Sequence, residues 1–102
     1  MNEQYFIYQL KPVRENLMVH QTVEEQSILE SHFFYLKSLK NEHKLLLAGP
    51  CLDAAFGIVI LQGLCEEEAH NVMQNDPAVY EKIMTAELHP FRVSLLHESV
   101  KK

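Results

Sequence analysis

The sequence predicts an α+β fold of the ferredoxin-like type, in which a βαββαβ chain forms a four-stranded antiparallel sheet. Short runs rich in aromatic and branched residues, which are typical of strands, occur near the beginning, the middle and the end of the chain. Two stretches with helical periodicity separate these runs. The two middle strands are close enough in sequence to pair as a hairpin, which completes the pattern.

Length and composition indicate one domain that covers residues 1–102, with 47% hydrophobic and 23% charged residues. The formal net charge is −5 and the nine Lys and Arg residues are scattered, which argues against a nucleic-acid partner. The N-terminus lacks the basic region of a signal peptide, and no apolar run approaches the ~20 residues of a membrane span. Cys51 and Cys65 lack the spacing of a redox or metal motif, so we expect a cytoplasmic protein.

The first strand is predicted at Tyr5–Leu10, where aromatic and branched residues dominate, and Pro12 ends it because proline cannot donate to the sheet. A polar loop that contains Arg14 follows. Thr22 is a suitable N-cap for a helix over Val23–Glu42, since acidic residues occupy its first turn.

This first helix has a broad apolar face with His32 near its centre. A ring that can carry charge in such a place needs a polar partner or stays neutral. Steps of ~100° per residue put Phe34 on the opposite side, so we expect Phe34 to be more exposed than Phe33. The face consists of Ile28, Leu29, His32, Phe33, Leu36 and Leu39.

The second strand is predicted at Leu45–Ala48, where the run is continuously apolar, and Gly49-Pro50 ends it. The third strand is predicted at Ala55–Gln62. Gly57 lies inside it and suggests a bulge or the close approach of another group.

A second helix is predicted to begin at Glu66–Glu68, where acidic side chains favour the positive end of the helix dipole, and to end at Asp76-Pro77. Its apolar face carries Ala69, Val72 and Met73, and Asp76 continues this face one helical turn further along. A short turn over Ala78–Lys82 leads to the last strand. In that strand apolar residues alternate with polar ones, the apolar positions being Phe91, Val93 and Leu95.

Both helices should cover one face of the sheet. The other face, expected to carry Phe6, Ile58 and Phe91, would then stay apolar and exposed. Pairing two such faces predicts a homodimer with the form of a dimeric α/β barrel.

Several segments in this order resemble the YciI-like (YCII-related) family, over nearly the whole chain. The resemblance implies a ferredoxin-like dimer whose pocket holds a His and Asp pair, which are His32 and Asp76 here. It also implies relatives that include a dehydrochlorinase of chlorinated hydroxyhydroquinones, and a wider superfamily that includes muconolactone isomerases. The segments are LKPVR, SHFFYL, LLLAGPCLDAAFGIVIL, EEEA, NDP and ELHPFRV.

A His–Asp pair suits proton abstraction next to a carbonyl or elimination of a leaving group, because the carboxylate fixes the tautomer of the ring. The alternative for His32 is a core histidine bonded to a backbone carbonyl, and Asp76 is also a natural N-cap. Arg14 could bind a substrate carboxylate or remain a solvated surface residue. Asp53 and His89 are further substrate-binding candidates, or turn and strand-start residues.

The leading hypothesis is a lyase- or isomerase-like enzyme that performs acid–base chemistry on a small aromatic or carboxylated molecule. The alternative is a non-catalytic dimeric module that binds a small ligand or supports a larger assembly. The expected partners are a second copy and a small molecule, with no membrane and no nucleic acid. No metal or other cofactor is predicted, since the six histidines form no H-x-H or H-x-x-x-H pair. An open cleft with an accessible His nitrogen would favour the enzyme.

Overall fold

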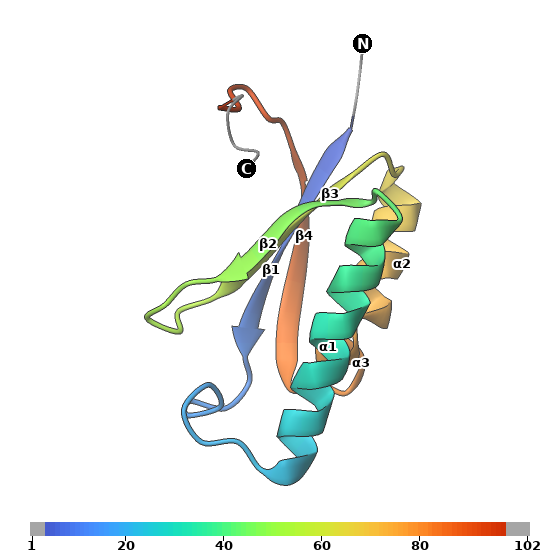
Figure 1. The fold of residues 1–102 in the computed structure, drawn as a ribbon. Helices are drawn as coiled ribbons and strands as arrows, with labels where there is room; N and C mark the ends of the chain where they lie inside the picture. The colour runs from blue at the N-terminus through green and yellow to red at the C-terminus, as the bar shows by residue number, and fades with distance from the viewer. Residues whose placement is uncertain (1–3, 98–102) are drawn as a thin grey trace.

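A computed structural model describes residues 4–97, and its strands and helices follow the predicted order with one short helix added. The strands form one antiparallel sheet in the order β2-β3-β1-β4, and the helices lie on one side of it (Figure 1). This is the ferredoxin-like α+β arrangement that the sequence predicts. The elements are β1 (Tyr5–Pro12), α1 (Val23–Asn41), β2 (Leu45–Pro50), β3 (Gly57–Gln62), α2 (Glu66–Asn75), α3 (Pro77–Tyr80) and β4 (Met84–Phe91).

Side-chain caps define where the helices begin. Thr22 Oγ1 accepts a hydrogen bond from Glu25 N at 3.0 Å, and Glu25 Oε1 accepts one from Thr22 N at 2.9 Å, which forms a capping box at the start of α1. Cys65 and Glu68 form the same reciprocal pair at the start of α2. Asp76 ends α2 and caps α3, where its Oδ1 accepts from Ala78 N at 3.0 Å. The sequence therefore places Asp76 at a helix junction.

The hydrophobic core lies between the sheet and the helices. On β1 every second side chain is buried against the helices, because successive residues of a strand point to opposite faces. None of the helices within residues 4–97 has both the length and the apolar character of a membrane span. Core residues include Phe6, Tyr8 and Leu10 of β1, Leu39 of α1, Val59 and Leu61 of β3, and Ala69 and Met73 of α2.

The last strand begins and ends earlier than the sequence pattern predicts. β4 pairs with β1 from Pro12↔Met84 to Tyr5↔Phe91, so the length of β1 fixes the length of β4. Val93 and Leu95 follow β4 in a segment without regular secondary structure, because β1 does not extend far enough to pair with them. The alternation after Phe91 was therefore a wrong indicator of a strand.

Gly57 is the first residue of β3 and is not at a bulge. The register shift of this hairpin lies between Leu45 and Leu47. A Cβ atom at Gly57 would lie 3.5 Å from Gly49 O, an ordinary contact, so the predicted bulge or close approach is wrong.

Two predictions of side-chain direction are also wrong. The exposed fractions of Phe33 and Phe34 are nearly equal, at 60% and 61%. Phe33 lies ~100° around α1 from His32 and is already outside the buried face, while Phe34 lies on the opposite side. Tyr35 takes the place expected for Phe33 in that face, where it packs against the core. Phe6 faces the helices, because it shares its side of β1 with Tyr8, and so it does not belong to the open face.

Candidate functional site

His32 and Asp76 form a hydrogen bond where the middle of α1 passes the junction of α2 and α3. The distance between His32 Nδ1 and Asp76 Oδ1 is 2.7 Å. The side chain of His32 is 16% exposed and that of Asp76 is 0% exposed. The predicted proximity of these two residues, which are 44 positions apart in the chain, is thus present in the structure.

The carboxylate of Asp76 is surrounded by donors. Besides His32, the hydroxyl of Tyr8 donates to Oδ2 at 2.8 Å and the backbone N–H of Ala78 donates to Oδ1 at 3.0 Å. A buried carboxylate is tolerated only when such donors replace water. Because an ionised carboxylate only accepts hydrogen bonds, these contacts suit Asp76 in its charged form.

The hydrogen bond to Asp76 determines which nitrogen of His32 can act as a base. Nδ1 carries the proton that it donates to Asp76, so Nε2 has the free lone pair when the ring is neutral. Within residues 4–97, Nε2 of His32 has no hydrogen-bond partner. The pair is therefore arranged so that Asp76 orients the ring and Nε2 can accept a proton.

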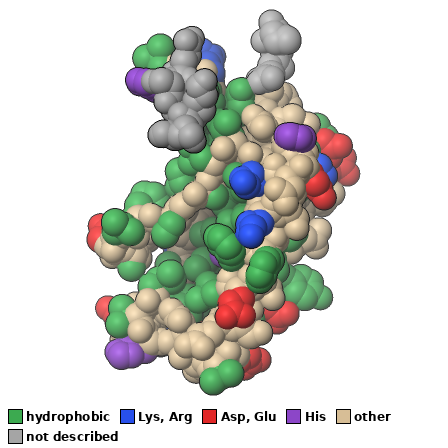
Figure 2. All heavy atoms as spheres, viewed as in Figure 1, with side chains coloured by type: hydrophobic (Ala, Val, Ile, Leu, Met, Phe, Trp, Pro, Cys, Tyr) green, Lys and Arg blue, Asp and Glu red, His purple; other side chains and the backbone are tan. Residues whose placement is uncertain are grey.

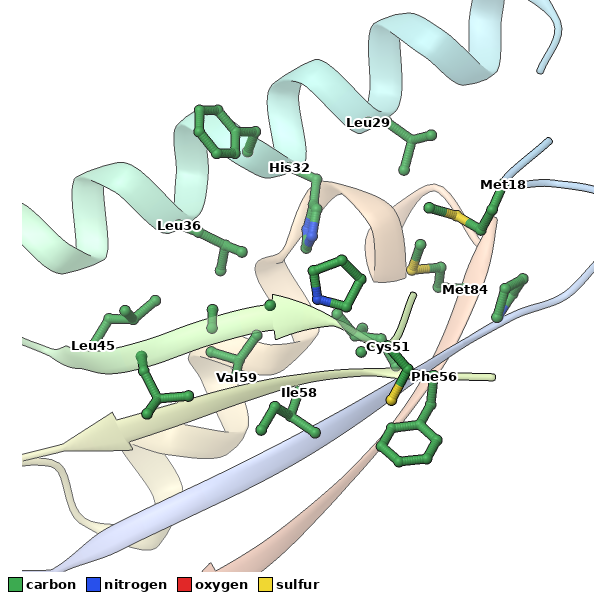
Figure 3. A pocket seen from close by; sticks show the side chains of 18 of the residues that line it. Met18, Leu29, His32, Leu36, Leu45, Cys51, Phe56, Ile58, Val59 and Met84 are labelled. Atoms are coloured by element: carbon green, nitrogen blue, oxygen red, sulfur yellow. The ribbon is translucent and has the colours of Figure 1, made fainter. Parts of the chain in front are cut away.

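His32 lines a cavity of about 920 Å³ beside α1 and the β2–β3 hairpin, which we call the His32 cavity. In Figure 3 the ring of His32 points from α1 toward the strands, with Leu29 and Leu36 on the same helix to either side of it. Apolar side chains dominate the lining, which favours an apolar or aromatic ligand. The lining also includes Leu45, Val59 and Met84.

Comparisons with known proteins identify the family and the fold of the chain. The profile of the YCII-related domain matches residues 7–91. The chain belongs to the YCII-related family. No curated protein matches the chain.

Two solved structures share the fold of this YCII-related chain. One is 5-chloro-2-hydroxyhydroquinone dehydrochlorinase (TftG) from Burkholderia phenoliruptrix AC1100, in complex with 2,5-dihydroxybenzoquinone. Its TM-score is 0.67, with 20% identity over 86% of this chain and 93% of that chain. The other is a mutant of SnoaB, a cofactor-independent oxygenase from Streptomyces nogalater, with a TM-score of 0.50 and 9% identity over 97% of this chain and 100% of that chain.

Two tyrosines near the pair were missed by the sequence prediction. Burial, and then the negative charge of Asp76, raise the pKa of Tyr8, so its hydroxyl remains a donor. Tyr35 donates to Val72 O at 2.7 Å, and burial followed by the charges of Asp76 and Glu42 raises its pKa to about 12. The alternation of β1 and the position of Tyr35 three residues after His32 are the signals that could have identified them.

These raised pKa values predict that the domain loses stability in alkaline solution. Below pH 10.0, the ordinary pKa of tyrosine, folded and unfolded chains both keep the phenol proton. Above pH 10 the unfolded chain loses the proton first, so the free energy of unfolding falls as the pH rises. Tyr35 contributes to this fall from about pH 10 to about pH 12, and the contribution of Tyr8 continues at still higher pH. Urea unfolding across this range should show the loss. Tyr35→Phe should make the free energy of unfolding fall less steeply with pH, whereas Tyr80→Phe, at an exposed tyrosine, should leave this slope unchanged. Equal slopes for the two variants would contradict the role of Tyr35.

Arg14 does not reach the His32 cavity. Its guanidinium pairs with Glu25, with 2.5 Å between Nη2 and Oε1 and 3.3 Å between Nε and Oε2, and it also donates to His20 O. The pKa of Glu25 is below its usual value, chiefly because its carboxylate accepts hydrogen bonds from Arg14. Arg14 therefore ties the β1–α1 loop to the start of α1, and the structure does not support its expected role as a substrate anchor.

Asp53 and His89 are also outside the lining of the cavity. Asp53 Oδ1 accepts a hydrogen bond from Ala55 N at 3.0 Å and so stabilises the β2–β3 turn. His89 is exposed beside Glu87, with 3.4 Å between Nε2 and Oε1, because it points away from the helices on β4.

Cys51 does line the cavity. Within residues 4–97, no group of three or more His, Cys, Asp and Glu residues is placed to hold a metal ion.

Proposed function

We propose that this YCII-related protein is a small acid–base enzyme, lyase- or isomerase-like, that acts on a small aromatic or carboxylated molecule. The observation that carries the proposal is the hydrogen bond between His32 Nδ1 and the buried carboxylate of Asp76, which leaves Nε2 as the base in an apolar cavity. A neutral imidazole whose Nδ1–H donates to a carboxylate can accept a proton at Nε2.

In the proposed reaction His32 Nε2 removes a proton from a carbon next to a carbonyl, or from a hydroxyl of the keto tautomer of a phenolic substrate. The electrons of the broken bond form a new double bond, and a leaving group such as chloride departs with its own electron pair. In an isomerisation the proton returns from Nε2 to another carbon of the same molecule. Asp76 stabilises the imidazolium while Tyr8 and Ala78 hold the carboxylate in place.

The dehydrochlorinase named above acts on a chlorinated hydroxyhydroquinone, which supports this substrate class. We therefore choose 5-chloro-2-hydroxyhydroquinone as the test compound and chloride release as the measurement. The enzyme hypothesis predicts release above the spontaneous rate. Binding of 2,5-dihydroxybenzoquinone without any turnover of the chlorinated compound would instead favour the non-catalytic ligand-binding module.

The proposed active form is a homodimer that pairs the open faces of two sheets. In register, Leu47 of β2 lies beside Ile60 of β3, and Ile60 lies beside Ile7 of β1. With Ile58 these side chains make an apolar row on the face opposite the helices. Such a row is typical of a surface that a second copy covers.

We expect the wild-type protein to have twice the mass of one chain in light scattering at micromolar concentration. Ile7→Arg puts a charge next to Ile60 at the β1 end of the apolar row, so it should shift the protein to monomer because a buried unpaired charge is costly. Ser38→Arg, on the exposed side of α1, adds the same charge outside the row and should leave the dimer intact. A monomeric wild-type protein would exclude the barrel.

A further inference from the structure

The charged side chains that line the His32 cavity have one sign. Lys37 and Lys40 lie in its lining, and among the described residues the lining includes no Asp or Glu. The whole chain has a formal net charge of −5, so a positive edge is unexpected from composition alone. Figure 2 shows basic side chains beside hydrophobic ones on this face of the molecule.

Within residues 4–97 neither lysine forms an ion pair with a carboxylate. The ammonium of Lys37 lies 5.8 Å and 5.7 Å from the ring centroids of Phe33 and Phe34, which is a cation–π arrangement. By contrast, Lys44 Nζ is 3.2 Å from Glu42 Oε1. The two cavity lysines therefore keep their charges available for a ligand, whereas Arg14 is already paired with Glu25.

Both lysines lie on α1, the same helix as His32. At 1.5 Å of rise per residue, Lys37 is ~7.5 Å and Lys40 is ~12 Å along the helix axis from His32. The flexible lysine stem allows each ammonium to reach back along the helix surface. One aromatic ring with an acidic substituent can bridge this separation, with its reacting atom at His32.

We propose that Lys37 and Lys40 bind the acidic group of the substrate, so that the His32 cavity selects aromatic molecules that carry a carboxylate or a phenolate. The proposal names the substrate class of the proposed enzyme and rests on that function only for the role of His32. The ring of the ligand occupies the apolar lining, and its charge stays at the edge where the lysines are.

The test compares 2,5-dihydroxybenzoate with 2,5-dihydroxybenzamide, which have nearly the same shape and differ in charge. Calorimetry at low salt should show the acid binding about tenfold more tightly, since an exposed ion pair contributes up to about fivefold per lysine. Added salt should reduce this preference by screening the charges. In Lys37→Gln/Lys40→Gln the ratio of the two affinities should approach one.

Lys44→Gln is the matched control, because Lys44 pairs with Glu42 and does not line the cavity. It should keep the preference for the acid. Equal binding of acid and amide to the wild-type protein, no binding of either, or a preference retained in the double variant would each overturn the proposal.

His32→Ala separates this proposal from the proposed reaction. The variant should keep the preference for the acid, since the lysines remain; loss of the preference in this variant would assign the selectivity to His32 and overturn the role of the lysines. A wild-type protein that prefers the acid but turns over no substrate would contradict the reaction and leave the charge selection established.

Discussion

Replacing His32 with alanine is expected to lower turnover by about 10²–10⁴-fold, the range that a positioned general base contributes. The variant loses Nε2, the nitrogen that faces no partner within the described residues. Asp76 keeps its hydrogen bonds from Tyr8 and Ala78, so the junction of α2 and α3 should persist. We expect a loss of about 1–3 kcal/mol in the free energy of unfolding, because one donor to a buried carboxylate is removed.

The measurement is kcat/KM of the wild-type and variant proteins on the same substrate, with circular dichroism to verify the fold. His70→Ala is the control, since His70 is exposed on α2, and it should leave the rate unchanged. Added imidazole should restore part of the activity of His32→Ala by entering the space that the ring leaves. A variant as fast as the wild-type protein would remove His32 from the mechanism.

Most of the fold could be predicted because it depends on local patterns. The aromatic and branched residues of β1, the Thr22 cap of α1 and the acidic first turn of α2 each indicate their element with little help from the rest of the chain. Gly49-Pro50 was expected to end the second strand after Ala48, and that prediction is wrong, because both residues pair with β3 inside β2. The position of β4 could not be predicted in this way. Its ends depend on pairing with β1, and the alternating sequence after Phe91 contains no information on where the partner strand stops.

The site was predicted in part for the same reason. His32 is visible as a titratable ring in a helical stripe, and Asp76 as the residue that ends a helix. Tyr8 joins them only because β1 lies under the helix junction, which is a tertiary contact. Arg14, the expected anchor, lies outside the lining of the cavity because loop geometry brings it to Glu25. The lysines were missed because an exposed lysine on a helix has no distinctive sequence signal.

Asp76→Ala is expected to destabilise the domain more than His32→Ala does, with a loss of about 3–5 kcal/mol in the free energy of unfolding. The change leaves the Tyr8 hydroxyl, the His32 Nδ1–H and the Ala78 N–H without their acceptor. It also removes the cap of α3, which alone costs about 0.5–2 kcal/mol. Domains have a total stability of about 5–15 kcal/mol, so at the lower end of this range the loss would leave the domain close to unfolding.

Asp76→Asn separates the charge of this residue from its geometry. The amide oxygen can still accept from His32 and Ala78, and the amide N–H₂ can donate to Tyr8 if that hydroxyl rotates to accept. The fold should therefore survive with a loss of about 1–2 kcal/mol. Turnover should fall by roughly 10²-fold, because the neutral amide no longer stabilises the imidazolium.

Urea unfolding at a fixed protein concentration measures the loss of stability in both variants, since the stability of a dimer depends on concentration. Asp53→Ala is the matched control: Asp53 also accepts one backbone hydrogen bond, but it is exposed in the β2–β3 turn, so its loss should stay below about 1 kcal/mol. If Asp76→Ala unfolded at the same urea concentration as Asp53→Ala, the buried carboxylate would not be the centre of the network. A stable but inactive Asp76→Asn, beside an unstable Asp76→Ala, would assign the hydrogen bonds to folding and the charge to catalysis.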